Sequence, residues 1–120
     1  MTDDQKPAEI VRPIRWASLR TDEAERVIRE RAKDQGKIIF GTHAFERIEQ
    51  RSITQVDALN ILKMGCVREE PQKLSGEGDW TVIVERRMPG GRMAGVVTII
   101  FHPPSDTLFV KTVEWLDLKR

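Results

Sequence analysis

One histidine and two arginines recur at helical spacing in the segment THAFERIEQRSIT, residues 42–54. His43, Arg47 and Arg51 are four residues apart, so on a helix they form one stripe across about 80° of its surface. His43 falls in the first turn, where the positive end of the helix dipole favours a neutral imidazole that accepts a proton. The same helix end and the two guanidinium groups suit a bound phosphate.

These groups match the requirements of RNA cleavage by attack of the ribose 2′-hydroxyl on the adjacent phosphate. A neutral imidazole takes the hydroxyl proton, and paired cations stabilise the charge that grows on the phosphorane. This chemistry needs neither a metal nor another cofactor. The same spacing is also typical of an ordinary salt-bridged surface, because Glu46 and Glu49 lie between the cations. Spacing alone favours this second interpretation.

Further candidate residues lie in the second half of the chain. Thr98 either points its hydroxyl into the same cleft or is simply a strand former. Lys111 either adds charge for a phosphate or protects a sheet edge from aggregation. A basic tip flanks the Pro-Gly-Gly turn at 89–91, and it either contacts RNA or is a solvated hairpin end. Its residues are Arg86, Arg87 and Arg92.

Three helices are predicted, over residues 21–36, 42–51 and 54–65, and the middle one carries the basic stripe. Thr54 and Asp57 form a variant capping box at the start of the last one. In the middle helix Ala44, Phe45 and Ile48 lie beside the stripe and are expected to face the core. The stripe should therefore border a cleft between this helix and a sheet.

Strands follow the helices and are predicted over residues 67–74, 80–87, 94–101 and 108–115. Pro71 weakens the first, and the third is expected to be central because β-branched residues occupy both of its faces. Residues 38–40 form either a short strand or an extended link. The order predicts an α+β fold, with N-terminal helices packed on one face of a three- to four-stranded antiparallel sheet.

The length of 120 residues fits one domain, expected over residues 14–120 after a flexible tail at 1–13. A net charge of +1 gives no general attraction to nucleic acids, so any such site is local. Cys66 is the one cysteine, which excludes an internal disulfide, and it is expected to be a small buried residue. With no signal-like start and no membrane-length apolar run, we expect a cytoplasmic protein with no membrane partner.

The run HAFERIEQRSITQVDALNILKMG at 43–65 and the strand VVTII at 96–100 resemble the bacterial family called domain of unknown function 4258. That family shows an H-A-x-x-R-x-x-x-R-x-I helix, a following helix that ends at glycine, and a later V-V-T-x-x strand. The resemblance covers roughly residues 38–115. The family is grouped by fold with the barnase–EndoU–colicin–RelE set of small ribonucleases and toxins.

The resemblance implies a RelE-like, metal-independent ribonuclease, as the toxin of a toxin–antitoxin system with an antitoxin-like protein partner. It also implies an active site, which would consist of His43, Arg47, Arg51 and Thr98. The alternative is a non-catalytic module of the same fold that binds a protein or a nucleic acid. The helix pair at 42–51 and 54–64 is arranged a little like a helix-turn-helix, but the near-zero net charge argues against DNA.

Overall fold

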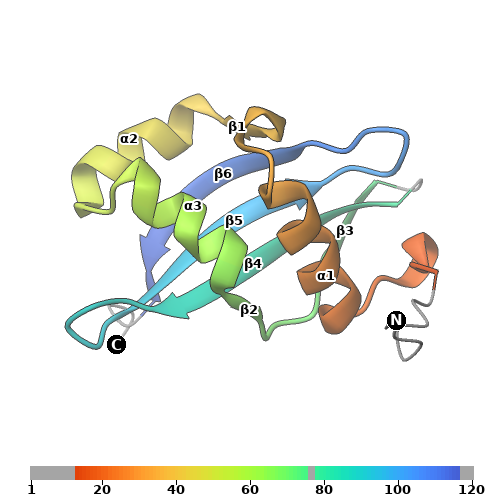
Figure 1. Ribbon diagram of the computed structural model, residues 1–120, viewed down its shortest axis with the longest axis horizontal. Helices are drawn as coiled ribbons and strands as arrows, with labels where there is room; N and C mark the ends of the chain where they lie inside the picture. The colour runs from red at the N-terminus through yellow and green to blue at the C-terminus, as the bar shows by residue number, and fades with distance from the viewer. Residues whose placement is uncertain (1–12, 76–77, 117–120) are drawn as a thin grey trace, which may run out of the picture.

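The computed structural model describes residues 13–75 and 78–116, in which three α-helices precede most of the strands (Figure 1). The helices are α1 (Thr21–Ala32), α2 (Thr42–Arg51) and α3 (Gln55–Met64). The strands are β1 (Ile38–Phe40), β2 (Cys66–Val67), β3 (Gln72–Ser75), β4 (Asp79–Arg87), β5 (Met93–Ile100) and β6 (Leu108–Trp115). Two 3-10 turns, η2 (Trp16–Ser18) and η3 (Gln35–Lys37), flank α1. The tail predicted at 1–13 lies, except for Pro13, outside the described residues.

The strands form one six-stranded mixed sheet in the order β1-β6-β5-β4-β2, with β3 also paired to β4. The α+β class is confirmed, and so is the central place of β5. The predicted three- to four-stranded antiparallel sheet is wrong in two respects. Residues 38–40 form a strand parallel to β6. The expected strand at 67–74 is divided at Pro71 into β2 and β3, since proline cannot donate to a ladder, and both pair with β4.

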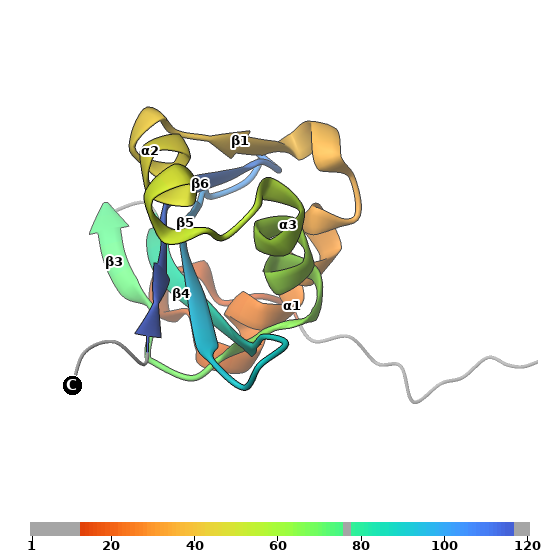
Figure 2. The ribbon, with the colours of Figure 1, turned by 90° about the vertical axis from the view of Figure 1, so that its left-hand side faces the viewer.

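The core lies between the sheet and the two helices α1 and α3, which cover the same face (Figure 2). Alternate residues of β5 point to this face and are buried: Ala94, Val96, Thr98 and Ile100. The apolar stripe of α1 meets them with Ala24, Val27, Ile28 and Ala32. Among the described residues no helix is long and apolar enough to span a bilayer.

The helix α2 packs against β6 just beyond the point where β1 ends. The Gly41 N–H donates to the Val110 carbonyl over 3.0 Å, so the β1–β6 ladder continues to the first residue before α2. A Cβ at Gly41 would lie only 2.6 Å from Cζ of Phe109, so a larger residue at this turn would require the Phe109 ring to move. The short parallel strand β1 therefore sets the position of α2 on the sheet.

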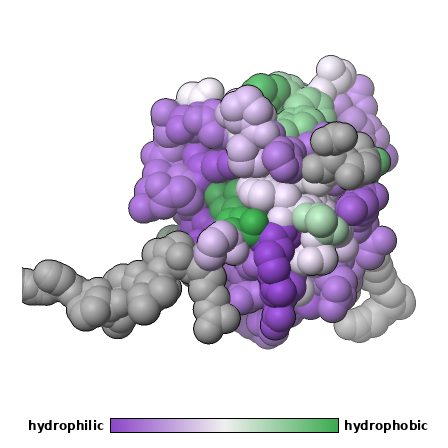
Figure 3. Space-filling view, turned by 90° about the vertical axis from the view of Figure 1, so that its right-hand side faces the viewer, coloured by the Kyte–Doolittle hydropathy of each residue, from purple (hydrophilic) through white to green (hydrophobic). Residues whose placement is uncertain are grey.

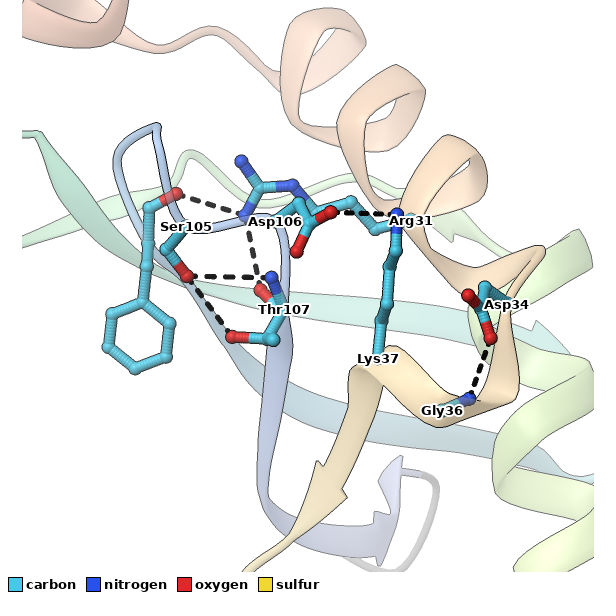
Figure 4. A network of polar contacts seen from close by, with 8 residues as sticks. Arg31, Asp34, Gly36, Lys37, Ser105, Asp106 and Thr107 are labelled. Carbon is cyan, nitrogen blue, oxygen red and sulfur yellow. Dashed lines mark hydrogen bonds and ion pairs between the residues drawn. The ribbon is translucent and has the colours of Figure 1, made fainter.

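Arg31 connects α1 to the turn that precedes β6 (Figure 4). Its side chain is buried, and Nη1 donates to the carbonyls of Phe101 at 2.9 Å and Thr107 at 3.1 Å. Burial lowers the pKa of the Arg31 guanidinium, and the carboxylate of Asp106 opposes this effect. Asp106 also pairs with Nζ of Lys37 over 2.7 Å. These polar contacts fix the start of β6, the strand against which α2 packs.

Candidate functional site

The helix α2 begins after Gly41 and ends at Ser52, which takes a left-handed conformation with φ of 57°. His43 is the second residue of α2, so its predicted place in the first turn is confirmed. Its side chain is 56% exposed. Ala44 and Ile48 face the core as expected, whereas Phe45 is 49% exposed and stacks its ring near that of Phe40.

The side chains of His43 and Arg47 contact each other on the outer surface of α2. Nε of Arg47 donates to Nε2 of His43 over 3.2 Å, and Nη1 of Arg47 donates to Oε1 of Gln50 over 2.6 Å. A guanidinium has no acceptor, so Nε2 of His43 is unprotonated in this contact. The structure thus places a proton-accepting nitrogen beside a cation on an exposed helix face.

Arg51, the third member of the stripe, is used differently. Its Nη1 donates to the carbonyl of Val113 in β6 over 3.3 Å, and its own carbonyl accepts from Nε1 of Trp115 over 2.7 Å. Both contacts join the end of α2 to the outer edge of β6. The two arginines of the predicted stripe are both half-buried, but Arg47 bonds to the side chains of His43 and Gln50, whereas Arg51 holds the helix to the sheet.

Thr98 lies on the helix-covered face of β5 but does not reach an open cleft. Its side chain is fully buried, with 0% exposure, and its hydroxyl donates to the carbonyl of Phe109 over 3.0 Å. The prediction of a hydroxyl directed into a substrate cleft is therefore wrong for this structure. A buried hydroxyl needs a partner, and the neighbouring strand supplies one.

The basic tip approaches α2 through Trp115. The guanidinium of Arg92 lies 4.0 Å from the centre of the Trp115 ring, whose N–H is bonded to the carbonyl of Arg51. Arg87 is exposed and folds back on the turn, since its Nη1 donates to the Gly91 carbonyl over 2.6 Å. One aromatic residue thus connects the end of α2 with the β4–β5 turn, a link that residue spacing in the sequence did not indicate.

The other predicted RNA-binding residues lie apart from this link. Lys111 is exposed on β6, at the register shift where Thr98 pairs with Val110 and Val97 with Thr112. Arg86 is half-exposed and lines a separate hollow of about 430 Å³.

That hollow also contains the thiol of Cys66, which is exposed, so its predicted burial is wrong. A second hollow, of about 540 Å³, lies at the start of α1 between Arg15 and Glu23. Neither hollow is lined by His43 or Arg47, whose contact with each other is exposed to solvent. Among the described residues, no group of three His, Cys, Asp or Glu side chains is placed to hold a metal ion.

The two ends of the molecule carry different surface residues. The end opposite to α2, with β3 and the β5–β6 turn, is mostly hydrophilic with small hydrophobic areas (Figure 3). Helix α2 and the β4–β5 turn lie at the other end (Figure 2). The His43–Arg47 contact is on α2, and the Arg92–Trp115 contact is at the β4–β5 turn. The candidate site is therefore assigned to the α2 end.

Comparison with protein-family models, with curated proteins and with solved structures found no match to this chain. The relationship to the domain of unknown function 4258 family therefore stays a prediction from the motif in α2 and α3.

Proposed function

We propose that the protein is a metal-independent ribonuclease with a RelE-like fold that acts as the toxin of a toxin–antitoxin pair. The observation that carries the proposal is the contact between Arg47 and the exposed, unprotonated Nε2 of His43. A phosphate-binding cation and a proton acceptor are thereby adjacent on one helix face. The order of elements supports the RelE-like assignment, because α1 and α3 cover one face of the antiparallel strands β4, β5 and β6.

In the proposed reaction, the scissile phosphate attracts the guanidinium of Arg47 and leaves Nε2 of His43 free. That nitrogen takes the proton of the 2′-hydroxyl, whose oxygen bonds to phosphorus while the bond from phosphorus to the 5′-oxygen breaks. The leaving 5′-oxygen takes a proton from solvent water, and the imidazolium of His43 returns its proton to the solvent. The products are a 2′,3′-cyclic phosphate and a 5′-hydroxyl. Arg47 stabilises the negative charge on the phosphorane that forms before the bond to the 5′-oxygen breaks.

In our proposal the other two residues have roles that differ from those implied by the family resemblance. Arg51 already donates to the Val113 carbonyl, so in our proposal it positions α2 rather than binding the scissile phosphate. Thr98 is buried and bonded within the sheet, so it stabilises β5 against β6 and takes no part in the reaction.

The flanking RNA would lie across the α2 end of the molecule. Arg92, placed over the Trp115 ring, and the exposed Arg87 supply positive charge at the β4–β5 turn, whereas Arg86 and Lys111 lie apart from this surface. Contacts of this kind bind phosphates without reading the base sequence, and their affinity falls as the salt concentration rises.

Expression in a bacterial host tests the proposal. Wild-type protein is expected to arrest growth, and His43→Ala is expected to be harmless although it folds and accumulates equally. His102→Ala, which changes the one other histidine, serves as the control and keeps the arrest. A wild-type protein as harmless as His43→Ala would contradict the toxin proposal.

The alternative is a module that binds a protein without catalysis. It is favoured by a large apolar side chain exposed on α2 itself, that of Phe45, which is 49% exposed. Single apolar residues on a surface are common, so this observation weighs less than the His43–Arg47 contact. Equal harmlessness of wild type and His43→Ala would support this alternative.

A further inference from the structure

Both ring nitrogens of His43 face a charged neighbour on α2. Nε2 accepts from Nε of Arg47 over 3.2 Å, and Nδ1 lies 3.6 Å from Oε1 of Glu46. The arginine can only donate, so in the neutral ring the proton is on Nδ1. This proton then faces the carboxylate of Glu46, three residues along the same helix, at 3.6 Å, just beyond hydrogen-bond distance in the free protein.

We propose that Glu46 is a positioning residue that keeps His43 in the Nδ1–H tautomer, with Nε2 ready to accept a proton. This inference rests on the proposed function and adds a residue to it. The tautomer of a histidine is set by the partner of its other nitrogen, and a carboxylate is the strongest such partner in a side chain. Glu46 acts only through His43 in this proposal.

The need for Glu46 arises when substrate binds. A phosphate that attracts the guanidinium of Arg47 removes the donor that holds Nε2 as an acceptor. The proton could then move to Nε2, and that tautomer has no lone pair there for the 2′-hydroxyl proton. The carboxylate of Glu46 keeps the proton on Nδ1 after Arg47 has left.

In the free protein, Gln50 holds Arg47 in place. Its Oε1 accepts from Nη1 of Arg47 over 2.6 Å, which holds the guanidinium against Nε2 of His43 until an anion competes for it. The four side chains Glu46, His43, Arg47 and Gln50 thus form one chain of contacts along the exposed side of α2.

Proton–nitrogen correlation spectra of the histidine ring test the tautomer directly in isotope-labelled full-length protein. In the presence of inorganic phosphate, wild-type His43 is expected to remain in the Nδ1–H form. Glu46→Ala is expected to shift it toward Nε2–H, whereas the matched control Glu49→Ala, on the same exposed helix, leaves it unchanged. An unchanged tautomer in Glu46→Ala with phosphate would overturn the proposal.

RNA cleavage gives the second readout. Glu46→Ala is expected to lower kcat by roughly tenfold or more with KM little changed, and Glu46→Asp to recover part of the loss. A KM effect alone would overturn the positioning role. If the tautomer shifts as expected while wild-type protein cleaves no RNA, the positioning by Glu46 stands and the ribonuclease proposal fails.

Discussion

The indole N–H of Trp115 donates to the backbone carbonyl of Arg51 over 2.7 Å, and the Arg51 guanidinium donates to the carbonyl of Val113 two residues earlier on β6. The two bonds run in opposite directions between the end of α2 and the edge of β6. They occupy an arginine that the sequence motif had grouped with His43 and Arg47. The distinction between Arg51 and Arg47 is therefore open to measurement.

Alanine substitution should lower mainly the stability of the fold at Arg51 and mainly the rate of RNA cleavage at Arg47. Arg51→Ala removes a partly buried hydrogen bond and is expected to lower the free energy of unfolding by about 1 kcal/mol. Arg47→Ala removes only solvent-exposed hydrogen bonds to His43 and Gln50, so it should alter stability by less than about 0.5 kcal/mol while lowering the rate of RNA cleavage by roughly a hundredfold. Urea unfolding and single-turnover cleavage check this. Equal effects of the two variants on both quantities would contradict the assigned roles.

Gly65 ends α3 where the chain passes close to β4. A Cβ there would lie 2.6 Å from the Glu85 carbonyl oxygen and 2.7 Å from that of Ile61. Both are backbone atoms that cannot move freely, so Gly65→Ala is expected to cost about 1–3 kcal/mol in unfolding free energy. Gly36→Ala is the control, because its Cβ would meet only the flexible side chain of Asp34 at 3.2 Å. A Gly65→Ala variant as stable as wild type would rule out the close approach.

The buried carboxyl of Glu23 should make the free energy of unfolding depend on pH in the acid range. Burial would raise the pKa of this carboxyl, but the N–H groups of Arg20 and Arg15 and the Arg15 side chain outweigh it, so the pKa lies below its ordinary value. A lowered carboxyl pKa stabilises the folded state above the unfolded pKa of about 4.3, and this contribution is lost as the pH falls through the folded value.

Glu23→Gln should therefore reduce the free energy of unfolding by about 1 kcal/mol at neutral pH and by less in acid. Urea unfolding at about pH 7 and about pH 3 measures the difference. Glu30→Gln, whose carboxylate is 72% exposed, should show no such pH dependence. An equal loss for Glu23→Gln at both pH values would show that the carboxylate charge is not the cause.

The local elements could be predicted because each has a signal within a few residues. The capping box of α3 is present, with Thr54 Oγ1 accepting from the Asp57 N–H over 3.0 Å and Asp57 accepting from the Thr54 N–H over the same distance. The strand predicted at 108–115 has those bounds in β6. The parallel pairing of β1 with β6 could not be predicted, since it joins residues 38–40 to 108–110, far apart in the chain.

Burial at the candidate site was harder to predict than the elements themselves. Phe45 is apolar and on the expected side of the helix, yet α2 lies at the outer edge of β6, where too little of the sheet remains to cover it. Thr98 was placed on the correct face of its strand, but whether a hydroxyl faces a cleft or a carbonyl depends on how closely the helices pack above it. Both outcomes depend on tertiary packing that no local pattern contains.

The most direct test of the proposed function is the analysis of RNA products after incubation with the purified, folded protein, either on free RNA in the presence of a metal chelator or on intact ribosomes without the chelator. The account predicts fragments that end in a 2′,3′-cyclic phosphate, formed by wild type and reduced at least about a hundredfold in His43→Ala. RNA that stays intact under both conditions, or equal cleavage by His43→Ala, would contradict it.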